Sequence, residues 1–269
     1  MAHHLTWKLD PFAATALTVS LTWYAVGLWR MRQRGGLQHV PAFEIASFVI
    51  GWIVLAIALL SPLATLSEWL FSVHMTQHEL LMLVAAPLIA IGRPLTPMLF
   101  ALPQRWRRAT HVAAGTGVLT FLTAPVTVFA AHAAALWIWH LPPLYEAAVI
   151  SEGVHIIQHL CFTSTAALFW WSLIRGRYGR LGYGAALLYI FGTAVHSGGL
   201  GALLALSPVP WYPLYVDRAA GLADPLADQQ IGGMIMWVPS GIVMMLFALA
   251  LFAAWLGEAE RRRRKGWSQ

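Results

Sequence analysis

Seven long apolar stretches, separated by short polar or basic segments, divide this chain along its whole length. Each stretch has roughly the 20 mostly apolar residues that an α-helix needs to cross the hydrocarbon core of a bilayer. The two-residue alternation of an outer-membrane β-barrel is absent. The pattern predicts an all-α integral membrane protein, a single transmembrane domain over residues 1–269 built as a seven-helix bundle. We place the spans at residues 12–29, 43–60, 73–92, 112–139, 154–174, 183–206 and 231–256.

The fourth and seventh stretches are longer than one span requires, which predicts a tilt or a kink. Pro125 lies inside the fourth stretch and Pro239 inside the seventh, and proline bends a helix by removing a backbone donor. Pro87 has the same effect in the third stretch.

Composition supports the membrane assignment. The chain is 59% hydrophobic and only 10% charged, whereas soluble domains are about 25% charged. A mean hydropathy of +0.65 leaves no room for a sizeable soluble domain. The single Cys161 excludes an intramolecular disulfide and a cysteine-based copper motif.

The basic residues predict the orientation of the bundle. Fifteen of the 17 Lys and Arg follow the first, third, fifth and seventh stretches, and only Lys8 and Arg218 fall on the other side. By the positive-inside rule the N-terminus is outside and the C-terminus is cytoplasmic. The net charge of +6 sits beside helix ends, so its expected partner is anionic membrane lipid and no nucleic acid. We interpret the first stretch as a membrane helix because its basic residues follow it, unlike those of a signal peptide.

A six-residue pattern occurs twice, each time at the start of an apolar stretch. Val73-His74-Met75-Thr76-Gln77-His78 is followed later by Val154-His155-Ile156-Ile157-Gln158-His159. Two His four residues apart share one face of a helix. Imidazole is the commonest protein ligand for metals and also an axial haem ligand. The repeat therefore favours an intramembrane metal or haem site over two helix ends with interfacial His.

Further His and acidic residues gather on the predicted outer side, which has few Lys and Arg and so suits a cation. His132 and His140 are eight residues apart on the fourth stretch, although His140 also ends an aromatic belt. His196 lies deep among small residues, where a polar group is functional or is hydrogen-bonded to a neighbouring helix. The predicted metal residues are His74, His78, His155, His159, His140, His132, His196 and Asp228.

Three other features admit more than one interpretation. Glu79 either orients an imidazole or is a structural acid. The methionines of the apolar stretches either bind Cu(I) or fill the core. The loop Ser207–Gln230, with aromatics that suit the headgroup region, covers the His site, contacts a partner subunit, or has neither role.

Four segments, in order along the chain, resemble motifs of the CtaG-like cytochrome c oxidase assembly factors. They are Val73–Met82 with Ala85–Leu88, Leu136–Pro142, His155–His159 with Phe169–Trp171, and Asp228–Pro239. The similarity runs from about the second stretch to the seventh, so it covers most of the chain.

The resemblance implies an assembly factor of the bacterial inner (plasma) membrane that helps to mature a haem-copper cytochrome c oxidase by handling copper. Its expected partners are periplasmic copper donors and an oxidase subunit, and its expected site is the His cluster facing the periplasm. An unrelated single-span metallochaperone with Cys ligands shares the family name. This chain has neither that architecture nor those cysteines, so that mechanism does not transfer to it.

Two other functions stay open. The intramembrane His could ligate haem b in an electron-transfer protein, with His132 and His196 as a deeper level. Copper import is the second, although few candidate ligands lie in the cytoplasmic half. We expect no enzyme, because the chain has no P-loop, dinucleotide fingerprint, nucleophile elbow or His-Glu-x-x-His motif.

Overall fold

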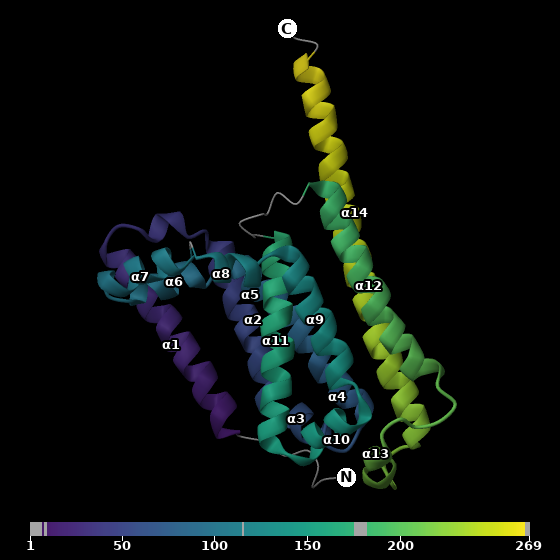
Figure 1. The fold of residues 1–269 in the computed structure, drawn as a ribbon. Coiled ribbons are helices and arrows are strands. Elements are labelled where there is room, and N and C mark those ends of the chain that lie inside the picture. Colours follow the sequence, from purple (N-terminus) through teal and green to yellow (C-terminus); the bar gives the residue numbers. More distant parts are fainter. Residues whose placement is uncertain (1–6, 8–9, 115, 175–181, 267–269) are drawn as a thin grey trace.

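A computed structural model describes all residues except 1–6, 8–9, 115, 175–181 and 267–269. Over these residues the regular structure is helical, with the long helices standing side by side (Figure 1). The longest helices are α1 (Pro11–Gln33), α2 (Ala42–Leu60), α9 (Pro125–Trp139), α11 (Glu152–Ile174), α12 (Tyr183–Leu206) and α14 (Pro225–Gly266). The third predicted span is built from α4 (Phe71–Glu79), η3 (Leu80–Ala85) and α5 (Ala86–Gly92).

In the part of the chain that the structure describes, five helical segments are long and apolar enough to cross a membrane, which identifies a membrane protein. They are Pro11–Gln33, Ala42–Leu60, Phe71–Gly92, Tyr183–Leu206 and Pro225–Arg264. α9 is a shorter apolar helix, and α11 is not among the five. The count of seven spans therefore stays a prediction.

The fourth predicted span is not one helix, and the prediction of a single helix over 112–139, tilted or bent at Pro125, is wrong. The chain forms α7 (Gln104–Ala114), α8 (Gly117–Leu122) and α9 instead. Ala124 adopts an extended backbone (φ −65°, ψ 136°), because the residue before proline avoids the helical region. Pro125 then occupies the first turn of α9, where its missing N–H costs nothing. It begins a helix instead of bending one.

The last helix is longer than predicted. α14 has 42 residues, begins ahead of residue 231 and passes Pro239 without an interruption. Its C-terminal turns extend beyond the other helices (Figure 1). Ion pairs three or four residues apart, such as Arg264 with Glu260 at 3.0 Å, support these exposed turns.

The third span contains a π-helical segment, η3, immediately before Pro87. Proline has no N–H, so a carbonyl in the preceding turn loses its helical partner. The indole Nε1 of Trp170 donates to the carbonyl of Met82 at 2.8 Å. A side chain of α11 thus satisfies the backbone that the π turn leaves open.

α12 and α14 run antiparallel and make the most extensive contact between two helices among the described residues (Figure 1). A Cβ added to Gly233 would lie 2.4 Å from the backbone nitrogen of Ala205. Only glycine permits this approach, as is common where membrane helices pack through small residues.

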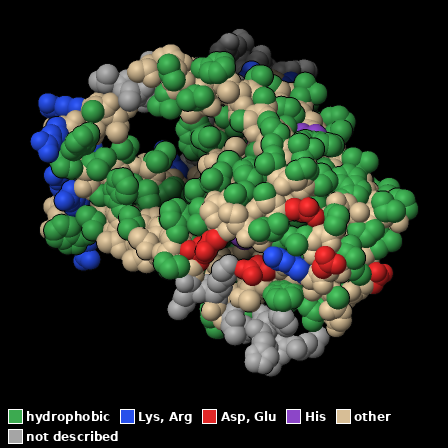
Figure 2. Space-filling model, turned by 60° about the horizontal axis from the view of Figure 1, so that its bottom comes forward, with side chains coloured by type: hydrophobic (Ala, Val, Ile, Leu, Met, Phe, Trp, Pro, Cys, Tyr) green, Lys and Arg blue, Asp and Glu red, His purple; other side chains and the backbone are tan. Residues whose placement is uncertain are grey.

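Short helices close one end of the bundle. α3 (Pro62–Leu66), α10 (Pro142–Ile150) and α13 (Pro213–Arg218) lie together there, whereas α6 (Leu95–Ala101), α7 and α8 lie at the opposite end with the end of α1 (Figure 1). Arg218 fastens α13 by donating to the carbonyl of Glu68 at 2.9 Å. The face at this end shows Asp and Glu side chains (Figure 2). It corresponds to the predicted outer side, although the orientation itself stays a prediction. The basic segment 175–181 falls outside the described residues.

Candidate metal site

The two His pairs meet between α4 and α11, which run in the same direction (Figure 1). Within each helix the rings are a turn apart, with centroids 4.4 Å apart for His74 and His78 and 4.1 Å for His155 and His159. Between the helices, His74 lies 5.3 Å from His155, and His78 lies 5.3 Å from His159. The repeated spacing therefore forms one cluster of four imidazoles.

Three of these residues offer ligand atoms at nearly coordinating distances. One ring nitrogen each of His74, His78 and His159 lie within 4.8 Å of one another. Two nitrogens on a common ion lie at most about 4.2 Å apart, because metal–nitrogen bonds are about 2.0–2.1 Å long. Small ring movements would bring all three nitrogens to one ion.

His140, at the end of α9, lies beside the cluster with its ring centroid 6.3 Å from that of His78. Its Nδ1 lies 2.7 Å from the carbonyl oxygen of Leu136. A carbonyl only accepts, so Nδ1 carries the proton and Nε2 keeps its lone pair. That Nε2 is buried without a hydrogen-bond partner among the described residues. His140 is therefore in the tautomer that a metal ligand requires.

His74 is held in the same tautomer by a chain of hydrogen bonds. The hydroxyl of Tyr215 donates to the carbonyl of Ser67 at 2.8 Å and lies 3.2 Å from Nδ1 of His74. Burial raises the pKa of Tyr215 above its ordinary value of 10.0, so the phenol keeps its proton. Because that proton is used on Ser67, the hydroxyl oxygen accepts from His74 Nδ1–H. The lone pair of His74 is left on Nε2.

His78 is 1% exposed, and neither of its ring nitrogens has a hydrogen-bond partner in the part of the chain that the structure describes. Nε2 of His74 is also buried and has no hydrogen-bond partner among the described residues. Each unsatisfied buried polar group costs roughly 1–3 kcal/mol. A bound cation would remove this cost at several nitrogens at once.

The loop between α12 and α14 covers the cluster with aromatic rings. Tyr212 of this loop packs at a tilt against Tyr145 of α10, with ring centroids 4.2 Å apart, and the Tyr145 ring lies 5.1 Å from that of His74. The Tyr212 hydroxyl donates to the carbonyl of His140 at 2.9 Å. The loop Ser207–Gln230 thus lies over the His cluster, one of the interpretations that the sequence left open.

Asp228, at the start of α14, caps α4. Its carboxylate accepts from the backbone N–H of Phe71 at 2.6 Å and from the backbone N–H and hydroxyl of Ser72. A carboxylate at a helix N-terminus stabilises the first turn. Both oxygens of Asp228 are engaged, so the structure places this residue as a support of the helix that bears His74 and His78.

The other two predicted residues lie away from the cluster. His132 is two turns below His140 on α9, about 12 Å along the helix axis. Its ring stacks on Phe169. The ring of His196, on α12, contacts Phe129 at 5.4 Å, and neither of its nitrogens has a hydrogen-bond partner among the described residues. The structure therefore separates His132 and His196 from the four paired His.

The sequence pattern does not predict that Tyr145 packs against the His74 ring or that Tyr215 forms a hydrogen bond with it. Tyr215 bonds to a residue 141 positions away, and no local spacing indicates such a contact. Its one visible signal is its place in an aromatic loop before the last helix.

Comparison with known proteins gives a family match over most of the chain. The sequence model described as cytochrome c oxidase caa3 assembly factor (Caa3_CtaG) matches residues 22–258. An uncharacterized protein of Mycobacterium leprae (strain TN) is 27% identical over 95% of this chain. Uncharacterized proteins of Mycobacterium bovis and Mycobacterium tuberculosis are each 26% identical over the same share. This chain spans about 40% of the length of these relatives. No solved structure matches it.

Proposed function

We propose a copper-handling role for this chain on one premise: it belongs to the cytochrome c oxidase caa3 assembly factor family. A factor that assembles a haem-copper oxidase must meet the oxidase before all of its metals are in place. We propose that this chain binds copper as cargo at the cluster of His74, His78 and His159 and delivers it to an oxidase subunit.

The observation that supports this proposal best is the convergence of three imidazole nitrogens within 4.8 Å. Imidazole suits copper in both of its common oxidation states. The hydrogen bonds of His74 and His140 leave an Nε2 lone pair on each ring, which is the arrangement typical of metal-bound His. Hence the residues present fit the proposed cargo.

The cluster is buried on one side and partly exposed on the other. His74 and His78 are 1% exposed, whereas His155 and His159 on α11 are partly exposed. We therefore place entry and release of copper on the α11 side. The acidic side chains at this end of the molecule would attract a cation (Figure 2).

The direction of delivery rests on the predicted orientation. With the N-terminus outside, the cluster faces the periplasm of a bacterial inner membrane. Periplasmic copper donors and an oxidase subunit are then its proposed partners, and anionic lipid is the proposed neighbour of the basic helix ends. A non-catalytic role accords with this proposal, because binding and transfer of a cation require no chemical step.

The geometry favours an ion over haem b. Two haem ligands face each other across a macrocycle, whereas the rings of His78 and Phe162 are in contact, with centroids 4.7 Å apart. No gap for a porphyrin is found between the paired His in the described residues, where ring centroids are 4.1–5.3 Å apart. A Soret band in the purified protein would nevertheless favour the haem alternative.

The decisive test replaces two ligands at once. The double variant His78→Ala with His159→Ala should insert normally, lose the copper that co-purifies with the wild type, and leave the oxidase short of copper. His39→Ala is the matched control, because His39 is exposed and remote from the cluster in sequence and fold. The first readout is the ratio of copper to protein in the purified variant, measured by inductively coupled plasma mass spectrometry. The second readout is the copper content of the oxidase. Equal copper in the double variant and the wild type would reject the proposal.

A further inference from the structure

His155 belongs to the imidazole cluster but not to the group of three nitrogens that fits one ion. Its ring centroid lies 4.1 Å from that of His159 and 5.3 Å from that of His74. The nitrogens that lie within 4.8 Å of one another, however, are those of His74, His78 and His159. His155 therefore touches the proposed ligands without being one of the three.

Exposure to solvent falls from the end of the bundle toward these ligands. Glu152, in the first turn of α11, is exposed, His155 and His159 are partly exposed, and His78 is 1% exposed. Residues three and four positions apart share one face of a helix. Glu152, His155 and His159 thus form a row along α11, in steps of about 4.5 and 6 Å along the helix axis. This α11 row leads from the surface to the buried part of the cluster.

The side chains of the α11 row suit a cation that moves between them. A carboxylate attracts a cation by its charge, and neutral imidazole binds copper in both common oxidation states. His159 lies between the two groups, because its ring contacts His155 on one side and lies 5.3 Å from that of His78 on the other. An ion held by His155 and His159 can therefore reach His78 without leaving His159.

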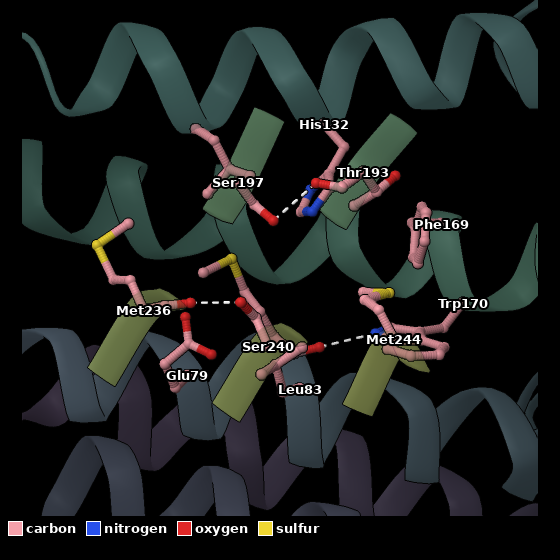
Figure 3. Close-up of a pocket in the computed structure, with 12 residues that line it drawn as sticks. Glu79, Leu83, His132, Phe169, Trp170, Thr193, Ser197, Met236, Ser240 and Met244 are labelled. Carbon is pink, nitrogen blue, oxygen red and sulfur yellow. Dashed lines mark hydrogen bonds between the residues drawn. The ribbon is translucent and has the colours of Figure 1, made fainter. Parts of the chain in front are cut away.

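The deeper side of the cluster offers no comparable row of ligands among the described residues. The ring of Phe162 lies against that of His78, with centroids 4.7 Å apart. Deeper in the bundle is a cavity of about 30 Å³, which has room for one or two waters. Figure 3 shows the side chains of Met236 and Met244 at opposite ends of this cavity, so their sulfur atoms do not form a binding site together. The α11 row is therefore the route by which an ion reaches and leaves the cluster.

We propose that His155 is the transfer ligand of the copper site. Copper binds first between His155 and His159, and then exchanges His155 for His78 and His74. In this exchange the Cu–N bond to His155 breaks as the bonds to His78 and His74 form, the bond to His159 persists, and the oxidation state of copper does not change. Release follows the same steps in reverse. The inference rests on the proposed function, because it describes how the same ion enters and leaves the same cluster.

A transfer ligand affects the rates of binding and release but not the affinity. His155 holds the ion only on its way, so losing its imidazole raises the barrier to entry and the barrier to exit by the same amount. Binding to His155 also makes the second step intramolecular, and without it that advantage is lost. Loading and release should therefore slow by one common factor, about tenfold or more, while the Kd stays the same.

The test follows Cu(I) transfer by stopped flow, from its coloured bicinchoninate complex to the full-length protein in detergent under reducing conditions, and back again. His155→Leu should slow both directions equally and leave the Kd unchanged. His155→Met is the matched variant, because leucine and methionine are similar in volume and only the thioether of methionine binds Cu(I). Its rates should return toward those of the wild type.

The outcomes separate this inference from the proposed function. A wild type that takes up no Cu(I) overturns both. If His155→Leu weakens the Kd and speeds release, His155 is a permanent ligand, and the transfer role is overturned while the copper site stands. Rates equal to those of the wild type in His155→Leu also overturn the transfer role alone. Should leucine disturb folding, His155→Gln, which keeps a polar side chain but no imidazole, must show the same equal slowing, and unequal or unchanged rates there overturn the inference.

Discussion

The Tyr215 hydroxyl oxygen accepts a hydrogen bond from Nδ1–H of His74 at 3.2 Å, although the two residues are 141 positions apart in the sequence. The contact joins the loop before α14 to the first turn of the third span. It sets which nitrogen of His74 faces the cluster, so a residue of the loop governs a proposed ligand without touching the ion.

Replacing Tyr215 by Phe should lower copper affinity about 10- to 100-fold, the usual effect of losing a group that orients a ligand. The cause is the loss of the acceptor for His74 Nδ1–H. Tyr24→Phe is the control, because the buried Tyr24 hydroxyl has no hydrogen-bond partner in the described part of the chain. Competition titration of both purified variants measures the effect, and equal affinities would contradict it.

Replacing Asp228 by Ala should destabilise the protein by about 1–2 kcal/mol, since α4 loses its N-terminal cap. Copper affinity should fall with it, because the same turn positions His74. Thermal unfolding in detergent tests the first effect. Asp217→Ala should change stability by no more than about 0.5 kcal/mol, because Asp217 is exposed. A stable Asp228 variant would exclude the capping role.

Replacing Gly233 by Ala should destabilise the α12–α14 pair by about 1–3 kcal/mol, because the new methyl group would meet backbone of α12. Gly241, on the same helix, has nothing within 4 Å of an added Cβ. Gly241→Ala should therefore be neutral or stabilising, since alanine favours a helix by up to about 1 kcal/mol. Gly233→Ala should therefore have a lower thermal unfolding midpoint than Gly241→Ala when the two variants are measured under the same conditions.

A reporter fused to the C-terminus should be active in the cytoplasm, and one fused to the N-terminus should be active outside. The reason is the arginine-rich end of α14, which the positive-inside rule retains in the cytoplasm. Periplasmic activity of the C-terminal fusion would reverse the orientation and, with it, the side from which copper is collected.

The helices could be predicted where hydrophobicity alone determines them. The sixth predicted span and α12 have the same bounds, residues 183–206. The break before α9 was missed because a 28-residue apolar run looks continuous, while the geometry around Pro125 divides it. The π turn was missed because Pro87 predicts a disturbance without specifying its form.

The candidate site could be predicted as far as local spacing reaches. His four residues apart share a face, and the repeat suggested that both faces meet, as the ring distances describe. Their partners could not be found in this way. The bonds of Asp228 to α4 and of Tyr215 to His74 depend on how distant helices pack, and a single sequence contains no direct record of that packing.

The π-helical turn at Leu80–Ala85 makes the third span sensitive to its length. A π turn holds one residue more than an α turn, so deleting a single residue there would let the span continue as a regular helix. Each residue of a helix accounts for about 100° of rotation. After the deletion, His74 and His78 would swing by that angle relative to α5 and face away from α11. Relatives that preserve the site should therefore vary the side chains between His78 and Pro87 more readily than the number of residues between them.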